Sequence, residues 1–170
     1  MQPKKDKITI RPARPEDIRE RGERGIRDLF NTVRRDERHH GRSPLAPPQY
    51  GNWSRAMEKQ SAGEERFQVL VAEYKGDIIG FCMATHLKDA SSTTLNKLFT
   101  APEVHGAGLG RSFIKAVQKK AAELGKTTVN TSAEAGKDKA SGFYQHLGFK
   151  VTGTETTAGG TKKHYLRLSI

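Results

Sequence analysis

The stretch that decides the fold is LFTAPEVHGAGLGRSFIKAVQKKAAEL, residues 98–124. An extended segment over residues 94–99 leads into Pro102, which disfavours helical geometry at the residue before it. A loop with glycines at 106, 108 and 110 follows. Apolar residues then recur every three to four positions, which predicts an amphipathic helix over residues 109–124. They are Leu109, Phe113, Val117, Ala121 and Leu124, and Gly125 supplies the stop.

A strand that turns through glycines into a helix predicts an anion site. The first N–H groups of a helix have no intrahelical partner, and glycines let the backbone approach a phosphate closely. Two common phosphate loops do not fit. Arg111 stands where the Gly-x-Gly-x-x-Gly pattern needs its third glycine, and where a P-loop needs its lysine.

The run Pro102-Glu103-Val104-His105-Gly106-Ala107-Gly108-Leu109-Gly110 resembles the acyl-CoA loop of the GNAT superfamily of N-acetyltransferases. The common form of that loop is Pro-Glu-Tyr-Arg-Gly-x-Gly-x-Gly, and here His105 stands where Arg or Gln is usual. A second run, ASGFYQHLGF over residues 140–149, resembles the superfamily's Ala-x-x-Phe-Tyr-x-x-x-Gly-Phe segment. Lys137 replaces the usual Asn before it. The two motifs occur in the expected order and at the expected separation.

The resemblance implies transfer of an acetyl group from acetyl-CoA to an amine. It implies that coenzyme A lies against the end of the strand, the glycine loop and the second motif. The residues expected to hold it are Leu98, Phe99, Thr100, His105, Gly106, Ala107, Gly108, Leu109, Gly110, Arg111, Lys137, Lys139 and Tyr144. For Lys137 and Lys139, ordinary exposed lysines are an equally good interpretation.

The rest of the chain predicts one α/β domain over residues 1–170. Strands are expected at 7–11, 67–74, 78–87, 94–99, 127–133, 149–154 and 162–169. Helices are expected from Pro15 to about Val33 and over 49–61, 109–124 and 140–147. The order βααβββαβαββ is that of the superfamily. It implies a mixed, mostly antiparallel sheet with a parallel, splayed central strand pair and helices on both faces.

Composition narrows the alternatives. The single cysteine, Cys82, excludes an internal disulfide and a cysteine-based zinc site, and its apolar surroundings predict a buried thiol. His39 and His40 have no third ligand near them in sequence, so no metal site is expected. No apolar run approaches 18 residues, and we expect a cytoplasmic protein without membrane association.

The net charge of +11 is uneven: residues 1–60 carry +6, residues 61–110 carry −2 and residues 111–170 carry +7. No nucleic-acid motif accompanies this charge, so a basic surface that attracts coenzyme A is preferred over nucleic-acid binding. In the superfamily the acceptor cleft lies between the first two helices and the final hairpin. Both segments are basic here and would repel a polycation. We therefore expect the acceptor to be a small-molecule or peptide amine of net charge zero or below. The sequence is compatible with a homodimer.

The chemistry needs a proton donor for the leaving thiolate and a base for the ammonium of the acceptor. In the superfamily the tyrosine matching Tyr144 faces the thioester sulfur, so Tyr144 is the expected general acid. The alternative is a tyrosine packed in the core. No carboxylate occurs in residues 94–99, so the base is either Glu134 or His86. The missing carboxylate and Lys137 keep a second hypothesis open, a coenzyme A-binding relative with weakened catalysis.

Overall fold

The computed structural model describes residues 4, 7–41, 46–136 and 140–170. Its strands are β1 (Thr9–Pro12), β2 (Phe67–Tyr74), β3 (Asp77–Thr85), β4 (Ser92–Thr100), β5 (Thr128–Glu134), β6 (Lys150–Thr156) and β7 (Lys162–Ser169). Its helices are α1 (Ile26–His39), α2 (Tyr50–Ser61), α3 (Leu109–Glu123) and α4 (Ala140–His146), with short 3-10 turns η2 (Pro15–Asp17) and η3 (Pro102–Val104).

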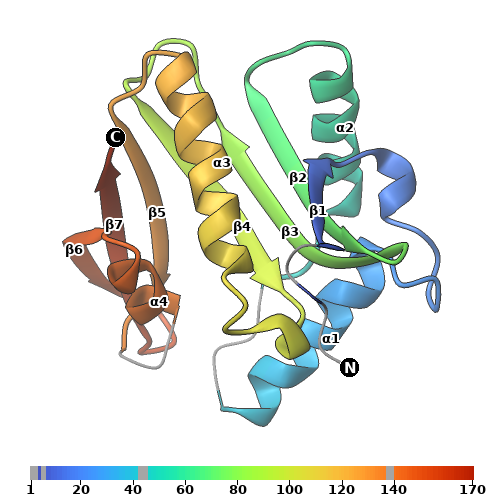
Figure 1. Ribbon diagram of the computed structural model, residues 1–170. Coiled ribbons are helices and arrows are strands. Elements are labelled where there is room, and N and C mark those ends of the chain that lie inside the picture. The colour runs from blue at the N-terminus through green and yellow to red at the C-terminus, as the bar shows by residue number, and fades with distance from the viewer. Residues whose placement is uncertain (1–3, 5–6, 42–45, 137–139) are drawn as a thin grey trace.

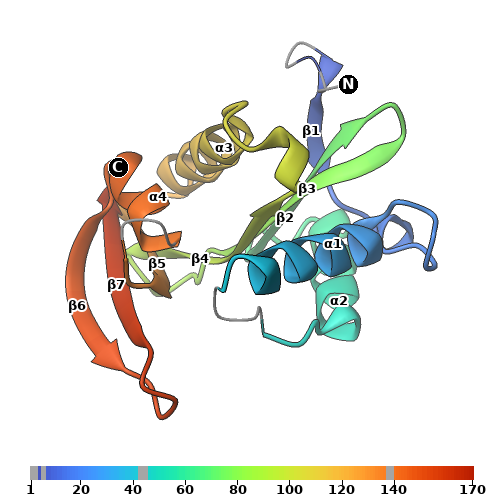
Figure 2. The same ribbon diagram turned by 90° about the horizontal axis from the view of Figure 1, so that it is seen from below.

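The strands form one sheet in the order β1-β2-β3-β4-β5-β7-β6, drawn in Figure 1. Every neighbouring pair is antiparallel except β4 and β5, which run parallel through the crossover helix α3. Helices α1 and α2 cover one face, and α3 and α4 cover the other (Figure 2). The predicted mixed sheet, its parallel central pair and its two helical layers are confirmed.

An aromatic cluster packs α1 and α2 against the middle of the sheet. Trp53 of α2 stacks on Phe81 of β3 with ring centroids 5.0 Å apart, and Phe81 stacks on Phe99 of β4 at 5.1 Å. Phe30 of α1 meets Phe99 edge to face at 5.7 Å. These rings are all buried. Aromatic pairs in these geometries add to the stability that burial alone gives, so the cluster fixes α1 beneath β4.

On the opposite face, α3 lies close to β3 because Gly80 has no side chain. A Cβ at Gly80 would stand 2.8 Å from the ring of Phe113, which is fully buried. The helix stripe predicted from the sequence therefore faces the sheet as expected. Cys82, two residues along the same strand, is fully buried and free, so the expectation of a buried thiol is confirmed.

The prediction for the first helix was wrong at both ends. The structure has the short turn η2 at Pro15, then an irregular segment, and α1 begins only at Ile26 and continues to His39. Arg19 and Arg24 adopt left-handed φ values of 55° and 53°, and Gly22 one of 92°. Left-handed residues at these three positions interrupt a right-handed helix, so the helix start expected at Pro15 begins only the short turn η2.

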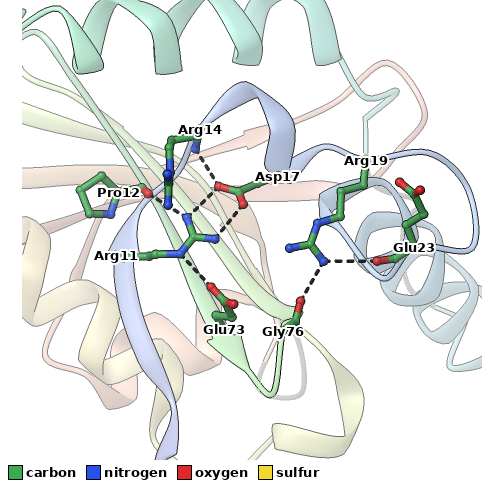
Figure 3. Close-up of polar contacts among 8 residues, drawn as sticks. All are labelled: Arg11, Pro12, Arg14, Asp17, Arg19, Glu23, Glu73 and Gly76. Atoms are coloured by element: carbon green, nitrogen blue, oxygen red, sulfur yellow. Dashed lines mark hydrogen bonds and ion pairs between the residues drawn. The ribbon is translucent and has the colours of Figure 1, made fainter.

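The segment before α1 is tied to the sheet by an ion network, shown in Figure 3. Arg11 of β1 donates from both terminal nitrogens to the carboxylate of Asp17 at 2.7 and 2.8 Å, and from Nε to Glu73 of β2 at 2.8 Å. The backbone N–H of Arg14 also donates to Asp17. Burial by itself would raise the pKa of Asp17, but these hydrogen bonds outweigh it and the pKa lies below its usual value. The network anchors the edge strand and the turn η2.

Among the described residues, no helix has the length and apolar character needed to cross a membrane.

Candidate active site

The central feature is the divergence of β4 from β5. The two strands pair only from Ser92 to Thr94 on β4, against Thr128 to Asn130 on β5. Beyond that point the wedge between them opens toward their C-terminal ends (Figure 1). The hydroxyl of Thr131 donates to the carbonyl oxygen of Leu95 at 3.1 Å and marks the last link between the strands. Among the residues that the structure describes, the later part of β4 therefore has no strand partner on its β5 side.

A β-bulge in β4 occurs at the same place. Lys97 pairs with Met83 and Leu95 pairs with Ala84, so Asn96 is an extra residue opposite β3. A bulge bends its strand and increases its twist. This explains how β4 turns away from β5 and leaves backbone groups available to a ligand. Nothing in the sequence of residues 94–99 signals this bulge.

The N-terminus of α3 is open toward the end of that wedge. Gly106 and Gly108 have φ values of 85° and 79°, and Gly108 is the N-cap without any side-chain cap. The first N–H that bonds back into the helix is that of Ser112, to Gly108. Within the described part of the chain, the N–H groups of Leu109 and Gly110 meet no acceptor. Together with the helix dipole they form a ready site for a phosphate.

The glycines of this loop serve two different purposes. A Cβ at Gly106 would meet nothing within 4 Å, so its glycine is needed for the left-handed backbone and leaves open space. A Cβ at Gly110 would stand 2.6 Å from the ring of Phe143, so that glycine permits close packing of α3 against α4. Only the first purpose bears directly on an anion.

The residues expected to bind the cofactor differ in how exposed their side chains are. The side chains of Phe99 and Leu109 are buried in the core, so these two residues can offer only their backbone. Leu98 and Thr100 are half-buried along the open part of β4, and His105 is exposed at the loop. Lys137 and Lys139 lie outside the described residues.

Tyr144 of α4 lies beside the point where the strands part. Its side chain is buried, with ring centroids 5.2 Å from Phe143 and 5.3 Å from Phe149. Burial raises the pKa of its hydroxyl, the nearby Cys82 adds to this, and contact with Thr131 opposes it. Tyr144 therefore keeps its proton throughout the neutral range. Its side chain occupies a core position, as the second interpretation from the sequence expected, and its role as general acid stays a prediction.

The two candidate bases differ sharply in their surroundings. His86 is buried: its Nδ1 is 2.7 Å from the hydroxyl of Thr93, and its Nε2 is 2.8 Å from the amide oxygen of Gln68. Burial, with contributions from Lys120 and Lys126, lowers its pKa to about 4. Both nitrogens are engaged near the start of β4, far along the strand from the glycine loop. These contacts do not support His86 as the base.

Glu134 ends β5, where the wedge has opened, and is half-buried. The side chain of Thr131 is on the α4 side of the sheet with Tyr144, so strand alternation places Ser132 and Glu134 on the face of α1 and α2. A base there would lie across the sheet from Tyr144. That separation suits a base and an acid that act on opposite sides of one reacting group.

Sequence reasoning missed Thr131, which links both strands and contacts Tyr144. Its place in the alternating run 127–133 could have marked it as an inward-facing hydroxyl. On α2, Trp53 and Met57 are buried in the core, and Tyr50 borders a cavity of about 400 Å³ together with Arg27 and Asn31.

Comparison with known proteins agrees with this geometry. The family described as "Acetyltransferase (GNAT) domain" matches residues 46–169. Uncharacterised N-acetyltransferases of Mycobacterium tuberculosis and Mycobacterium bovis are 30% identical over 105 residues, which is 62% of this chain and 67% of theirs. The chain therefore belongs to the GNAT acetyltransferase family, a family of acyltransferases.

Solved structures share the fold. PaiA N-acetyltransferase from Thermoplasma acidophilum, determined with coenzyme A, is 17% identical with a TM-score of 0.70, covering 96% of this chain and 99% of its own. YncA from Salmonella typhimurium, determined with acetyl-CoA, is 19% identical with a TM-score of 0.68, covering 96% and 94%. Nourseothricin acetyltransferase is 22% identical with a TM-score of 0.57. That match spans 61% of this chain and 65% of the other.

Proposed function

We propose that the protein is an acetyl-CoA-dependent N-acetyltransferase that acts on a primary amine of a small molecule or peptide by direct attack. The observation that carries the proposal is that three features lie next to one another. They are the unpaired side of β4, the uncapped N-terminus of α3 and the buried Tyr144. An extended chain ending in a pyrophosphate can lie along all three. The structures of PaiA with coenzyme A and of YncA with acetyl-CoA support this choice of donor.

Backbone groups make most of the proposed contacts with coenzyme A. The N–H groups at the start of α3 would bind the pyrophosphate of coenzyme A, and the backbone groups on the open side of β4 would hydrogen-bond to the amides of its arm. Gly106 allows the approach because a side chain would occupy the space in front of it. When bound, acetyl-CoA supplies a thioester whose acetyl carbon the amine attacks. A backbone N–H of β4 near the bulge can donate to the carbonyl oxygen as charge develops on it.

Tyr144 and Glu134 divide the proton transfers. The hydroxyl of Tyr144 is protonated at neutral pH and donates to the sulfur as it leaves. Glu134, directly or through water, accepts the proton that the ammonium must lose before it attacks. An alkyl ammonium has a pKa of about 10, so this removal costs roughly 4 kcal/mol at pH 7.

A thiol-release assay with acetyl-CoA and a panel of amines tests the proposal. Release that depends on the amine, with acetylated amine found by mass spectrometry, supports it. Binding of coenzyme A without turnover on any amine supports the alternative, a relative with weakened catalysis. Steeply salt-dependent DNA binding without coenzyme A binding would indicate a nucleic-acid-binding protein instead.

A further inference from the structure

Arg34 continues the buried stripe of α1. The stripe comprises Ile26, Leu29, Phe30 and Val33, and each of these is buried. Arg34 lies four residues after Phe30 and so occupies the same side of the helix, one turn or about 5.4 Å further along. Phe30 packs on Phe99 near the C-terminal end of β4, so the next turn of α1 continues from that contact. Figure 2 shows α1 crossing beneath β4 with its C-terminal end directed toward β5.

The guanidinium of Arg34 has no partner there. Its Nε is buried without a hydrogen bond, and the side chain makes no ion pair with any described residue. Since Nε is the buried unpaired atom, the two terminal nitrogens are open to solvent. A buried polar nitrogen without a partner is costly, and native structures seldom retain one unless a ligand or water completes it.

The neighbouring side chains on this face add further charge. Lys97 lies two residues before Phe99 on β4, and so alternation places it on the same face. Across the wedge, Glu134 of β5 is in register with Lys163 of β7, and Asn130 with Arg167, whose Nε donates to the Asn130 side chain at 3.1 Å. Glu155 accepts a hydrogen bond from Tyr165. Lys163 and Arg167 add basic groups to this face, and Glu134 and Glu155 are acidic groups on it. Glu37, three residues after Arg34 on α1, is a further carboxylate close to Arg34 along the helix.

We infer that Arg34 recognises a carboxylate of the acceptor, so the acceptor belongs to the amino-acid class, an amine and a carboxylate in one molecule. The planar guanidinium can grip a carboxylate through two parallel hydrogen bonds, which a single ammonium cannot reproduce. The amine end is then directed toward Glu134 and the wedge. This inference rests on the proposed function and names its acceptor.

The experiment compares acetylation of α- and ω-amino acids with acetylation of their primary amides, for the wild type and Arg34→Gln. For each substrate, kcat/KM of the variant is divided by kcat/KM of the wild type. This ratio does not depend on the basicity of the amine, which differs between the acids and the amides. We expect Arg34→Gln to lower kcat/KM for the acids by about 10–100-fold and for the amides by no more than about threefold. The ω-amino acids vary the distance between amine and carboxylate, so the best substrate among them indicates the distance between Arg34 and the reacting amine.

Two further variants serve as controls. Arg35→Gln removes the same charge from an exposed neighbour on α1 and should leave the preference for acids unchanged. Arg34→Lys keeps the charge without the planar fork and should recover only part of the loss, and it replaces Arg34→Gln if the latter does not fold. Acetyl-CoA affinity measured by calorimetry should be equal in all of them.

Equal losses on acids and amides, or no loss on either, would overturn the inference while acetylation of amides upholds the proposed function. If no amino acid or amide is acetylated, the inference fails, and the proposed function fails with it only if the wider panel of amines also gives no acetylated product.

Discussion

The hydroxyl of Thr131 donates to the carbonyl oxygen of Leu95 at 3.1 Å, at the position where β4 and β5 stop pairing. Thr131 also contacts the hydroxyl of Tyr144 and is itself buried. One side chain thus closes the inner end of the wedge and touches the expected acid. Thr131 therefore couples the place where the strands separate to the position of Tyr144.

Thr131→Val should destabilise the protein by about 1–3 kcal/mol, because the buried carbonyl of Leu95 loses its partner while the volume is kept. Turnover should fall as well, since the contact with Tyr144 is lost. Urea unfolding and steady-state kinetics measure the two effects. Ser132→Ala removes an exposed hydroxyl from the next position and should change neither. Unaltered stability in Thr131→Val would show that water replaces the hydroxyl.

Gly106→Ala should weaken acetyl-CoA binding by at least about tenfold, because the methyl group enters the space that the pyrophosphate would occupy. Gly63→Ala is a matched control, since both glycines have φ near 90° and both would place Cβ in open space. Each substitution should cost about 1–2 kcal/mol of stability from its left-handed backbone. Calorimetric titration separates them: only Gly106→Ala should lose affinity. Equal affinities would refute a phosphate site at this loop.

Tyr144→Phe should lower kcat on the order of 10²-fold and leave acetyl-CoA affinity unchanged, as expected for loss of a general acid. The raised pKa keeps the Tyr144 hydroxyl protonated as the pH rises, so its ionisation should cause no fall in kcat below about pH 10. Tyr74→Phe, at the end of β2, provides the control. Turnover within about threefold of the wild type would mean that water or another group protonates the thiolate.

His86 should make the fold sensitive to acid. Its pKa is lowered to about 4 in the folded protein against 6.5 normally, so folding favours the neutral ring. The stabilisation is complete above pH 6.5 and is lost as the pH falls toward 4, by on the order of 2–3 kcal/mol in all. Urea midpoints between pH 4 and 7.5 should show this loss in the wild type and a smaller one in His86→Gln. An identical pH dependence in the variant would contradict the assignment.

Arg11→Met should destabilise the protein by about 3–5 kcal/mol, because it leaves the buried carboxylate of Asp17 without its bidentate partner. The ion pair between Arg24 and Asp77 has a similar distance of 2.8 Å but an exposed arginine, so Arg24→Met should have little effect. Thermal unfolding of the two variants makes the comparison. A similar, small change in both would show that Asp17 is solvated or protonated once its partner is removed.

Much of this protein could be predicted from local pattern. The loop at Gly106 to Gly110 and the helix after it follow from glycine placement and a 3.6-residue apolar period, and both depend only on neighbours in the chain. The same holds for the strands with alternating or continuous apolar residues. The pair Phe143–Tyr144 could be located for the same reason, because a short motif carries it.

Long-range contacts decided the rest. A helix was expected from Pro15, yet Arg19 and Arg24 are left-handed and α1 starts only at Ile26, because the segment is held by contacts with β3 and with the turn that precedes it. One such contact is the hydrogen bond from Arg19 to the carbonyl of Gly76 at 2.8 Å, drawn in Figure 3. His86 looked suitable as a base from its ordinary pKa. Burial between Gln68 and Thr93 removed that property, and no local pattern encodes burial of that kind.

By itself, the sequence determined the order of strands and helices, the glycine loop and the family, since these are written in residue spacing. Only the tertiary structure decided where β4 parts from β5, which face each side chain takes beyond the bulge at Asn96, and that Nε of Arg34 is buried without a hydrogen bond. A one-residue bulge shifts the alternation of everything after it without changing any local preference. Its position is therefore set by the packing of the whole sheet, where α1 and α3 press on β4 from opposite sides.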